Sequence, residues 1–477
     1  MKAALTLLSL CLTAAVRAAI THLEFIPSGV PAFIGRPDLA IGTLTLSADR
    51  AESQGTVTLS LSGTNPRDLK SLALGQTKAR INGTKATFQV PINPGNNTYT
   101  LFAEPSPRAD LRRKLVIENK SVRIGSIVTS PMQLVDGKRK SKNFRIPGIV
   151  ETPKGTLVAV FDNRFNHAGD LPADITVGVS ISKDHGTTWS PIRTALDCNG
   201  LPGGNGIGDP AILVDPSNGR IWIAALRAPN SGHPIWSSSS GTLDPKNCGQ
   251  FILAYSDTEG RSWSKPINIT AEVKRLGDSD TASWGLVFQG PGAGIAMKDG
   301  TLVFPAQIWG NKGKAPHHGL LVYSKDHGKT WTSSKAMPFG GSESTVAQLP
   351  DGSLLLNTRE GGGAATRITA RTTDLGETWE KVSTTPLRQP NNLCQAALLA
   401  INDKLYFSNP NSSKRDTMTL RVSADQGKTW SNGLVYDPRK GAGYSSLCPV
   451  GKDALGVIYE GESDYHYFLR IPLDDLK

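Results

Sequence analysis

Residues 20 to about 125 alternate between apolar and polar side chains, which is the pattern of strands that bury one face. The alternation is clearest in Thr43-Leu44-Thr45-Leu46-Ser47 and in Thr56-Val57-Thr58-Leu59-Ser60-Leu61. Polar turn segments such as Pro94-Gly95-Asn96-Asn97 separate the predicted strands. We therefore predict a small antiparallel β-sandwich domain over residues 19–128. A structural or docking role is the first interpretation of this domain, and carbohydrate binding is the alternative.

From about residue 130 onward, strand-like apolar runs flank a repeated turn segment with the pattern S-x-D-x-G-x-T-W. In such a segment the Ser and Asp side chains bond nearby backbone N–H groups, the Gly adopts a conformation closed to other residues, and the Trp packs beneath the hairpin. We therefore interpret the aspartates as turn formers and not as catalytic groups. Four copies keep the Asp and a fifth has Thr258 in its place; the tryptophans that end the five copies are Trp189, Trp263, Trp331, Trp379 and Trp430.

The spacing of these tryptophans predicts the fold of the larger part of the chain. Successive intervals of 74, 68, 48 and 51 residues suit four-stranded blades joined by loops of variable length. About 350 residues make six blades of this size. We therefore predict an all-β protein, with a six-bladed β-propeller over residues 129–477 preceded by the small antiparallel β-sandwich domain.

The composition agrees with short strands and tight turns, because the 477 residues include 49 Gly and 31 Pro and only 19% are charged. With 52 Lys and Arg against 41 Asp and Glu, the net charge of +11 favours an acidic partner. The basic residues are scattered and not interleaved with aromatic residues, so we do not expect nucleic acid to be that partner. We expect no metal or other cofactor, because the histidines cluster only at His317-His318, which resemble loop residues, and no phosphate-binding glycine motif is present.

The first 19 residues, MKAALTLLSLCLTAAVRAA, combine Lys2 with a long apolar run and a small-residue ending. This pattern predicts a signal peptide over residues 1–18 and a mature protein that is secreted, periplasmic or held at the cell surface. Cys11 suggests a lipoprotein signal, but Leu10 before it is larger than such signals usually carry, so we do not expect a lipid anchor. No later stretch approaches the ~18 apolar residues that span a membrane.

Four cysteines follow the predicted signal peptide, namely Cys198, Cys248, Cys394 and Cys448. Their spacing matches no metal site, whereas an exported protein is free to form disulfides. A disulfide between Cys198 and Cys248 and buried free thiols are both compatible with the sequence.

The repeated turn resembles the Asp box of sialidases, and Phe144-Arg145-Ile146-Pro147 resembles the F-R-I-P motif that opens their propeller. Non-enzymatic propellers also carry Asp boxes, but the two motifs in this order make residues 130–470 similar to the bacterial-type exo-α-sialidases. The resemblance implies removal of terminal sialic acid from sialylated glycans or mucin-like glycoproteins without a cofactor, and we expect a monomer. A non-catalytic propeller that binds sialylated glycans and a trans-sialidase that uses the same residues are the alternatives.

Sialic acid carries a carboxylate on its anomeric carbon, and a guanidinium fork binds a carboxylate better than a lysine does. The resemblance implies three arginines for this anion: Arg145 in the F-R-I-P motif, Arg359 in Leu356-Asn357-Thr358-Arg359, and Arg415 in NPNSSKR. Arg421 is the alternative to Arg415, although its position just before an Asp box is typical of a strand.

The same carboxylate would repel a carboxylate nucleophile, and sialidases are the known exception in which a tyrosine attacks. Tyr444 in GAGYSSL resembles the nucleophile segment of the family. A tyrosine with a pKa near 10 needs a base, and Glu343 in GSEST resembles the carboxylate that activates it. The resemblance therefore implies a retaining mechanism.

Four further residues have counterparts in the family's site. Asp170, six residues after Arg164, resembles the acid/base, and Asp174 is its alternative. Arg164 and Asp209 resemble residues that contact the sugar near its 4-hydroxyl group, although both could instead form pairs that stabilise turns. Glu460 resembles the carboxylate that holds the first arginine of the triad in place.

Overall fold

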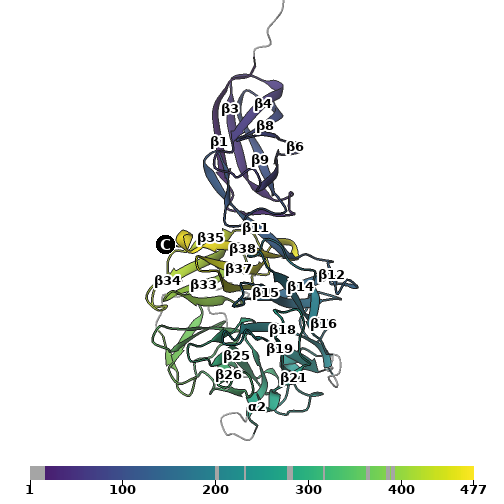
Figure 1. The fold of residues 1–477 in the computed structure, drawn as a ribbon, viewed down its shortest axis with the longest axis vertical. Helices are drawn as coiled ribbons and strands as arrows, with labels where there is room; N and C mark the ends of the chain where they lie inside the picture. Colours follow the sequence, from purple (N-terminus) through teal and green to yellow (C-terminus); the bar gives the residue numbers. More distant parts are fainter. Residues whose placement is uncertain are drawn as a thin grey trace, which may run out of the picture.

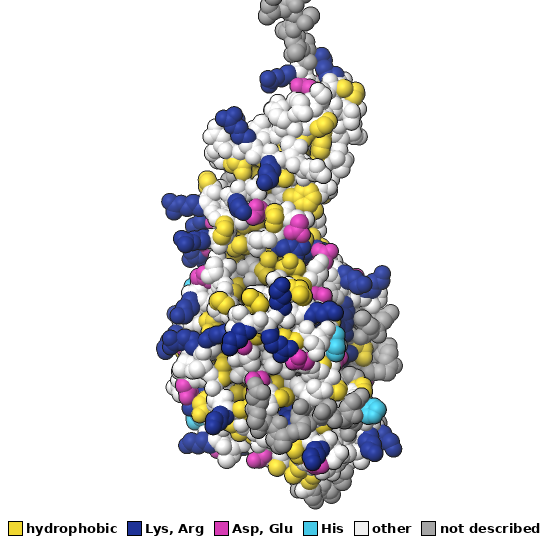
Figure 2. Space-filling model, turned by 90° about the vertical axis from the view of Figure 1, so that its right-hand side faces the viewer, with side chains coloured by type: hydrophobic (Ala, Val, Ile, Leu, Met, Phe, Trp, Pro, Cys, Tyr) yellow, Lys and Arg dark blue, Asp and Glu magenta, His cyan; other side chains and the backbone are white. Residues whose placement is uncertain are grey.

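The computed structural model describes residues 17–198, 204–229, 233–276, 283–314, 317–360, 366–382, 387 and 393–476. These residues form an elongated molecule with a small β-domain at one end and a larger β-domain at the other (Figure 1). The predicted signal peptide lies almost wholly outside the described residues. On the face in Figure 2, Lys and Arg side chains are spread over both domains and do not gather into one patch.

The small domain consists of two antiparallel sheets that enclose one apolar core. Alternation puts every second side chain inside, as in β8, where Ala86, Phe88, Val90 and Ile92 are buried. One sheet contains β1 (Ile20–Pro27), β3 (Ala40–Ala48), β9 (Gly95–Pro105), β5 (Leu69–Leu74) and β6 (Thr77–Lys78). The other contains β4 (Glu52–Ser60), β8 (Lys85–Ile92) and β7 (Arg80–Asn82).

The larger domain confirms the predicted all-β propeller. Within the described residues, six sheets, each built on four antiparallel strands, are arranged in a ring (Figure 1). Apolar side chains fill the space between neighbouring blades; for example, Val158 and Val160 of one blade pack with Ile212 and Ile223 of the next. Around most of the ring the first strands of neighbouring blades contact one another: β14 contacts β18 and β36, and β32 contacts β28 and β36.

The first five blades follow chain order. The strands of the first two blades are β14 (Asn143–Glu151), β15 (Leu157–Arg164), β16 (Ile175–Ser182) and β17 (Arg193–Leu196), then β18 (Gly204–Val214), β19 (Ile221–Pro229), β20 (Gln250–Ser256) and β21 (Ile267–Asn268). The third blade contains β22 (Trp284–Gln289), β25 (Leu302–Gly310), β26 (His317–Ser324) and β27 (Thr332–Ser333). The fourth and fifth contain β28 (Ser344–Gln348), β29 (Leu354–Thr358), β30 (Ile368–Thr372) and β31 (Glu380–Lys381), then β32 (Ala397–Ile401), β33 (Lys404–Pro410), β34 (Met418–Ser423) and β35 (Leu434–Asp437).

Short elements complete the propeller. The remaining strands have two residues each and are β2 (Ala32–Phe33), β12 (Leu134–Val135), β13 (Arg139–Lys140), β23 (Gly292–Ala293) and β24 (Ile295–Ala296). The described helices are α1 (Ile235–Ser238), α2 (Thr270–Lys274), η1 (Asn311–Gly313), η2 (Glu462–Asp464) and η3 (Leu473–Leu476).

The last blade combines strands from both ends of the domain. It contains β36 (Ser445–Val450), β37 (Ala454–Glu460), β38 (His466–Pro472) and β11 (Lys120–Thr129), and β10 (Lys114–Ile117) extends the sheet beyond β11. The register of β11 with β38 pairs Gly125 with Leu469 and Ser126 with Phe468. The predicted domain boundary at residues 128/129 therefore falls at the end of a strand that belongs to the last blade.

The repeated turns have the predicted hydrogen bonds. In the first box, Asp184 accepts hydrogen bonds from the backbone N–H of Thr188 at 2.9 Å and from its hydroxyl at 2.6 Å, while Ser182 Oγ accepts one from the N–H of Gly186 at 2.9 Å. In the copy that ends at Trp263, Thr258 stands where the other copies have Asp. Its hydroxyl accepts a hydrogen bond of 2.9 Å from the N–H of Ser262, so Thr replaces Asp without loss of the turn. The aspartates serve the fold, as predicted.

The first Asp box also packs against the last blade. Gly186 has a φ of 92° and lies against Phe468 of β38, so a Cβ at this position would meet the ring at 1.9 Å. Glycine is therefore required at this position for two reasons: its backbone conformation, and the close approach of the Phe468 side chain, which packs the last blade against the first.

We expect Gly186→Ala to lower the free energy of unfolding of the propeller by about 3 kcal/mol, because it adds overpacking to backbone strain. The matched control is Gly155→Ala, since Gly155 has a φ of 79° but open space around its Cβ position; strain alone costs about 1 kcal/mol there. Urea titration of the two variants measures the difference. Equal destabilisation would show that the contact between the first and last blades is unimportant.

Candidate active site

One cavity of about 600 Å³ lies at the ends of the blades opposite the Asp boxes. The boxes follow the third strand of five blades. The cavity is formed at the other end, where first strands start and second strands end, together with the loops that precede first strands or follow second strands. Seven of the nine candidate residues line the cavity: Arg145, Asp170, Asp209, Glu343, Arg359, Arg415 and Tyr444. The other two, Arg164 and Glu460, bond to residues in this wall.

Tyr444 and Glu343 form the closest contact at the floor of the cavity. The Tyr444 hydroxyl donates a hydrogen bond of 2.5 Å to Glu343 Oε1, and Arg359 Nη1 donates to the same hydroxyl at 2.9 Å and to Glu343 Oε2 at 2.6 Å. Burial and the charge of Glu343 raise the pKa of Tyr444 well above its usual value, although Arg359 opposes the shift. Tyr444 is therefore a neutral phenol whose proton already points at a carboxylate.

Glu460 of β37 connects Arg145 to the backbone of Tyr444. Its Oε1 accepts hydrogen bonds of 2.7 Å from Arg145 Nε and from the N–H of Ile146, and its Oε2 accepts one of 3.1 Å from the N–H of Tyr444. Burial alone would raise the pKa of Glu460, but the Arg145 charge and these hydrogen bonds lower it. One ionised carboxylate thus fixes the first arginine and the tyrosine relative to each other.

The guanidinium of Arg415 is held by backbone carbonyl groups near the Tyr444 ring. Its guanidinium donates to the carbonyls of Leu393, at 2.6 and 2.9 Å, and of Ala442, at 2.9 Å. The guanidinium carbons of Arg415 and Arg145 lie 5.4 and 5.3 Å from the centroid of the Tyr444 ring. These backbone carbonyls orient the Arg415 guanidinium in the cavity wall.

The alternative arginine is elsewhere. Arg421 is on β34, as its position before an Asp box predicted, where it is buried and donates a hydrogen bond of 3.2 Å to Asn409 Oδ1. It is absent from the cavity wall. The structure therefore brings Arg415, and not Arg421, together with Arg145 and Arg359.

Arg164 organises the carboxylates on another side of the cavity. Its side chain is only 1% exposed and donates to Asp162 Oδ2 at 2.8 and 3.0 Å and to Asp170 Oδ1 at 2.9 Å. Asp209 Oδ1 lies 4.0 Å from Arg164 Nη2. Burial together with the charge of Asp162 raises the pKa of Asp209. Asp170 is 55% exposed and faces the cavity, whereas Asp174 pairs with Arg139 outside it.

Sequence reasoning missed several residues of this site. Asp162 precedes Arg164 by two residues in β15, so strand periodicity could have placed both on one face. His317 is not a loop residue as predicted; it begins β26 and packs on Trp309, with ring centroids 4.1 Å apart, and both line the cavity. Gln307 of β25 also lines it and accepts a hydrogen bond of 2.9 Å from Trp309 Nε1. The Asp box of this blade ends at Trp331, on the far side from the cavity, and none of the quoted family motifs includes Gln307, Trp309 or His317.

The four cysteines after the predicted signal peptide are free, so no disulfide joins Cys198 to Cys248. Cys394 is buried beside Tyr444 and Ile146 in a small apolar cluster beneath the cavity. Among the described residues, no group of three or more His, Cys, Asp or Glu side chains is arranged to hold a metal ion. None of the described helices has the length and apolar character needed to cross a membrane.

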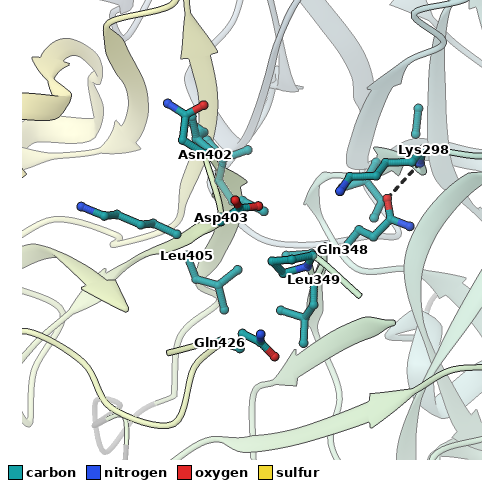
Figure 3. A pocket seen from close by; sticks show the side chains of 15 residues that line it. Lys298, Gln348, Leu349, Asn402, Asp403, Leu405 and Gln426 are labelled. Carbon is teal, nitrogen blue, oxygen red and sulfur yellow. Dashed lines mark hydrogen bonds between the residues drawn. The ribbon is translucent and has the colours of Figure 1, made fainter. Parts of the chain in front are cut away.

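A second cavity, of about 230 Å³, lies at the far end of the fourth and fifth blades. Figure 3 shows Gln348, Leu349, Asn402 and Asp403 around it, with the N–H of Lys298 bonded to Gln348 Oε1 at 2.9 Å. Strand β28 starts beside the catalytic candidates and ends at Gln348, so the two cavities lie at opposite ends of the blade. None of the nine candidate residues lines the second cavity.

Comparison with known proteins agrees with this arrangement. Residues 155–457 match the model of the BNR repeat-like domain. A sialidase of Bacteroides fragilis is 39% identical over 356 residues, which cover 71% of this chain and 64% of that protein. A sialidase of Clostridium perfringens is 30% identical over 69% of this chain and 88% of its own length.

The likeness extends to three dimensions. The solved structure of the Hadza microbial sialidase Hz136 superimposes with a TM-score of 0.80 at 30% identity, covering 95% of this chain and all of that one. The match includes the small N-terminal domain as well as the propeller, because it extends over nearly the whole chain. The chain therefore belongs to the bacterial-type sialidase family of glycoside hydrolases.

Proposed function

We propose that this protein is an exo-α-sialidase that releases terminal sialic acid from sialylated glycoconjugates with retention of configuration. The observation that carries the proposal is the 2.5 Å hydrogen bond from Tyr444 to Glu343 in a cavity walled by three arginines. The volume of about 600 Å³ is within the range of small-molecule sites and has room for a terminal sugar residue.

The three arginines would bind the carboxylate of the terminal sugar. Arg145 is held by Glu460, Arg359 by Glu343, and Arg415 by two backbone carbonyls, so each guanidinium is fixed before the substrate arrives. Fixed guanidinium groups lose little conformational entropy on binding and offer the paired donors that a carboxylate accepts. Their charge also stabilises negative charge that develops on the tyrosine oxygen nearby.

In the first step, Tyr444 Oη attacks the anomeric carbon while its proton passes to Glu343. The bond from that carbon to the bridging oxygen breaks, and Asp170 gives its proton to this oxygen, so the remaining glycan leaves as an alcohol. In the second step, water gives a proton to Asp170 and attacks the anomeric carbon. The bond to Tyr444 breaks, and the tyrosine recovers its proton from Glu343.

The first expectation concerns stereochemistry. Two displacements at one carbon retain its configuration, so a fluorogenic or aryl α-sialoside should be hydrolysed to the α-anomer first. Proton NMR during the first minutes of the reaction distinguishes the anomers. Initial release of the β-anomer would contradict the double displacement, and binding without any hydrolysis would favour the non-catalytic glycan-binding alternative. Transfer of sialic acid to an added acceptor, with little free sugar, would indicate the trans-sialidase alternative.

The second expectation concerns the arginines. Arg145→Lys and Arg359→Lys keep a positive charge but lose the fork, so kcat/KM should fall about 100-fold or more, equivalent to about 3 kcal/mol. Arg220→Lys is the matched control, because Arg220 also pairs with a carboxylate, that of Asp257, but at the Asp-box end of its blade. Kinetics on one small sialoside compare the three variants. Near-normal activity of both triad variants would mean that these arginines do not bind the carboxylate.

The third expectation concerns the nucleophile. Tyr444→Phe keeps the ring but removes the attacking oxygen, so activity on an aryl sialoside should fall about 10³-fold or more. Tyr323→Phe, outside the cavity, is the control and should leave activity unchanged. A 2,3-difluorinated sialic acid slows breakdown of the covalent intermediate, and peptide mapping should find the label on Tyr444. Label on Glu343 or Asp170 would assign the nucleophile to that residue instead.

A further inference from the structure

The acid/base candidate, Asp170, lies in the middle of an irregular loop. Residues 165–174 connect the end of β15 to the start of β16, and none of them belongs to a helix or strand. Backbone hydrogen bonding of regular structure therefore does not fix Asp170, and its side chain is 55% exposed. The position of its carboxyl group depends on a few side-chain contacts.

Two sets of contacts hold the tip of the loop. Arg164 Nη1 donates to the carbonyl of Ala168 at 2.7 Å and to Asp170 Oδ1 at 2.9 Å. Leu171 and Ala173 are buried in an apolar cluster with residues of the second and third blades. These contacts hold the tip of the loop, but they do not join its two ends.

The ends of the loop are joined by a backbone hydrogen bond and, in addition, by the side chain of Arg139, which comes from the β12–β13 hairpin. The N–H of Phe165 donates a hydrogen bond of 3.1 Å to the carbonyl of Asp174, which closes the base of the loop. The guanidinium carbon of Arg139 lies 3.7 Å from the centroid of the Phe165 ring, and Arg139 Nη2 lies 2.5 Å from Asp174 Oδ2. One side chain therefore contacts the first and the last residue of the loop at once.

The hairpin that carries Arg139 is itself fixed to the first blade. Asp136 Oδ1 accepts a hydrogen bond of 3.0 Å from the N–H of Thr194 on β17, and Asp136 Oδ2 accepts one of 2.7 Å from the Thr194 hydroxyl. The N–H of Asp136 donates to the carbonyl of Ile192 at 2.9 Å, and Val135 is buried. The backbone beneath Arg139 is thus rigidly attached to the same sheet that ends in the loop.

We propose that Arg139 is a positioning residue for acid/base catalysis: by clamping Phe165 to Asp174 it keeps the Asp170 carboxyl group within reach of the bridging oxygen of the substrate. The inference rests on the proposed function, since it requires Asp170 to protonate that oxygen. Arg139 does not line the catalytic cavity and acts through the loop alone. Both members of the ion pair are largely exposed, with side chains 55% and 39% accessible, so the clamp shapes a local loop more than it stabilises the whole fold.

The chain offers a matched control with the same chemistry in another place. The guanidinium carbon of Arg220 lies 4.0 Å from the centroid of the Tyr255 ring, and its Nε lies 2.7 Å from Asp257 Oδ1. Tyr255 and Asp257 are at the end of β20 that leads into an Asp box, away from the catalytic cavity. Arg220→Ala therefore removes an equivalent clamp without touching the acid/base loop.

The test compares leaving groups. An aryl sialoside with an acidic phenol needs little protonation, whereas a sialyl-galactoside needs a correctly placed acid. Arg139→Ala should lower kcat/KM about tenfold on the sialyl-galactoside and less than about twofold on the most activated aryl sialoside, and should steepen the dependence on leaving-group pKa. Arg220→Ala should behave as the wild type in the full-length protein. An equal loss on all substrates, or the same profile for both alanine variants, would overturn the inference.

A double variant tests whether Arg139 acts through Asp170. Asp170→Asn combined with Arg139→Ala should be no slower on the sialyl-galactoside than Asp170→Asn alone, because the acid is already absent. A further loss in the double variant would overturn the inference. If Arg139→Ala does not fold, Phe165→Leu removes the ring under the guanidinium and should show the same leaving-group dependence; a wild-type profile for that variant would count against the clamp.

These measurements separate the inference from the function on which it rests. A steep leaving-group dependence in Asp170→Asn, without one in Arg139→Ala, would overturn the role of Arg139 and leave the acid/base role of Asp170 intact. A flat dependence in Asp170→Asn itself would overturn the proposed acid/base assignment, and the inference with it.

Discussion

The constraint that governs this site is the confinement of several arginine charges in one small, largely buried space. Arg145, Arg359 and Arg164 repel one another and lose hydration, so the folded protein must supply negative charge close by without blocking the surface that meets the ligand. Glu460 does this for Arg145 and Asp162 for Arg164 from behind the cavity wall, where both carboxylates are nearly inaccessible to solvent. Arg359 pairs with Glu343, which is part of the wall itself. The acidic residues at the back of the site are therefore as necessary as the arginines at its front.

That charge balance links distant parts of the chain. Arg145 is on the first strand of the first blade and Glu460 is at the end of β37 in the last blade, so their 2.7 Å contact exists only when the ring is closed. Closure in turn uses β11, which precedes the first blade and pairs with β38. The position of Arg145 in the cavity and the closure of the propeller are therefore coupled.

The sequence predicted the fold and most of the candidate site residues because short sequence motifs mark both. The spaced Asp boxes indicated the blades, and motifs such as F-R-I-P marked Arg145, which the structure brings into one cavity with the other marked residues. Residues without a motif could not be found in this way. Trp309 and His317 reach the cavity because β25 and β26 pair side by side, and Arg139 reaches the loop that carries Asp170 from a separate hairpin. The strand that closes the ring was hidden for the same reason, since its partner is more than 300 residues away along the chain.

The Asp boxes and the catalytic loops occupy opposite ends of the blades, and this separation gives the architecture evolutionary freedom. The Asp boxes of the first five blades keep a fixed length, while the longer intervals of 74 and 68 residues reflect extra chain in the second and third blades. Part of that extra chain, between β19 and β20, carries Ile235 to the cavity wall. The loops at the cavity end can therefore change in length without altering the turns at the other end of the blades, which form the hydrogen bonds of the fold.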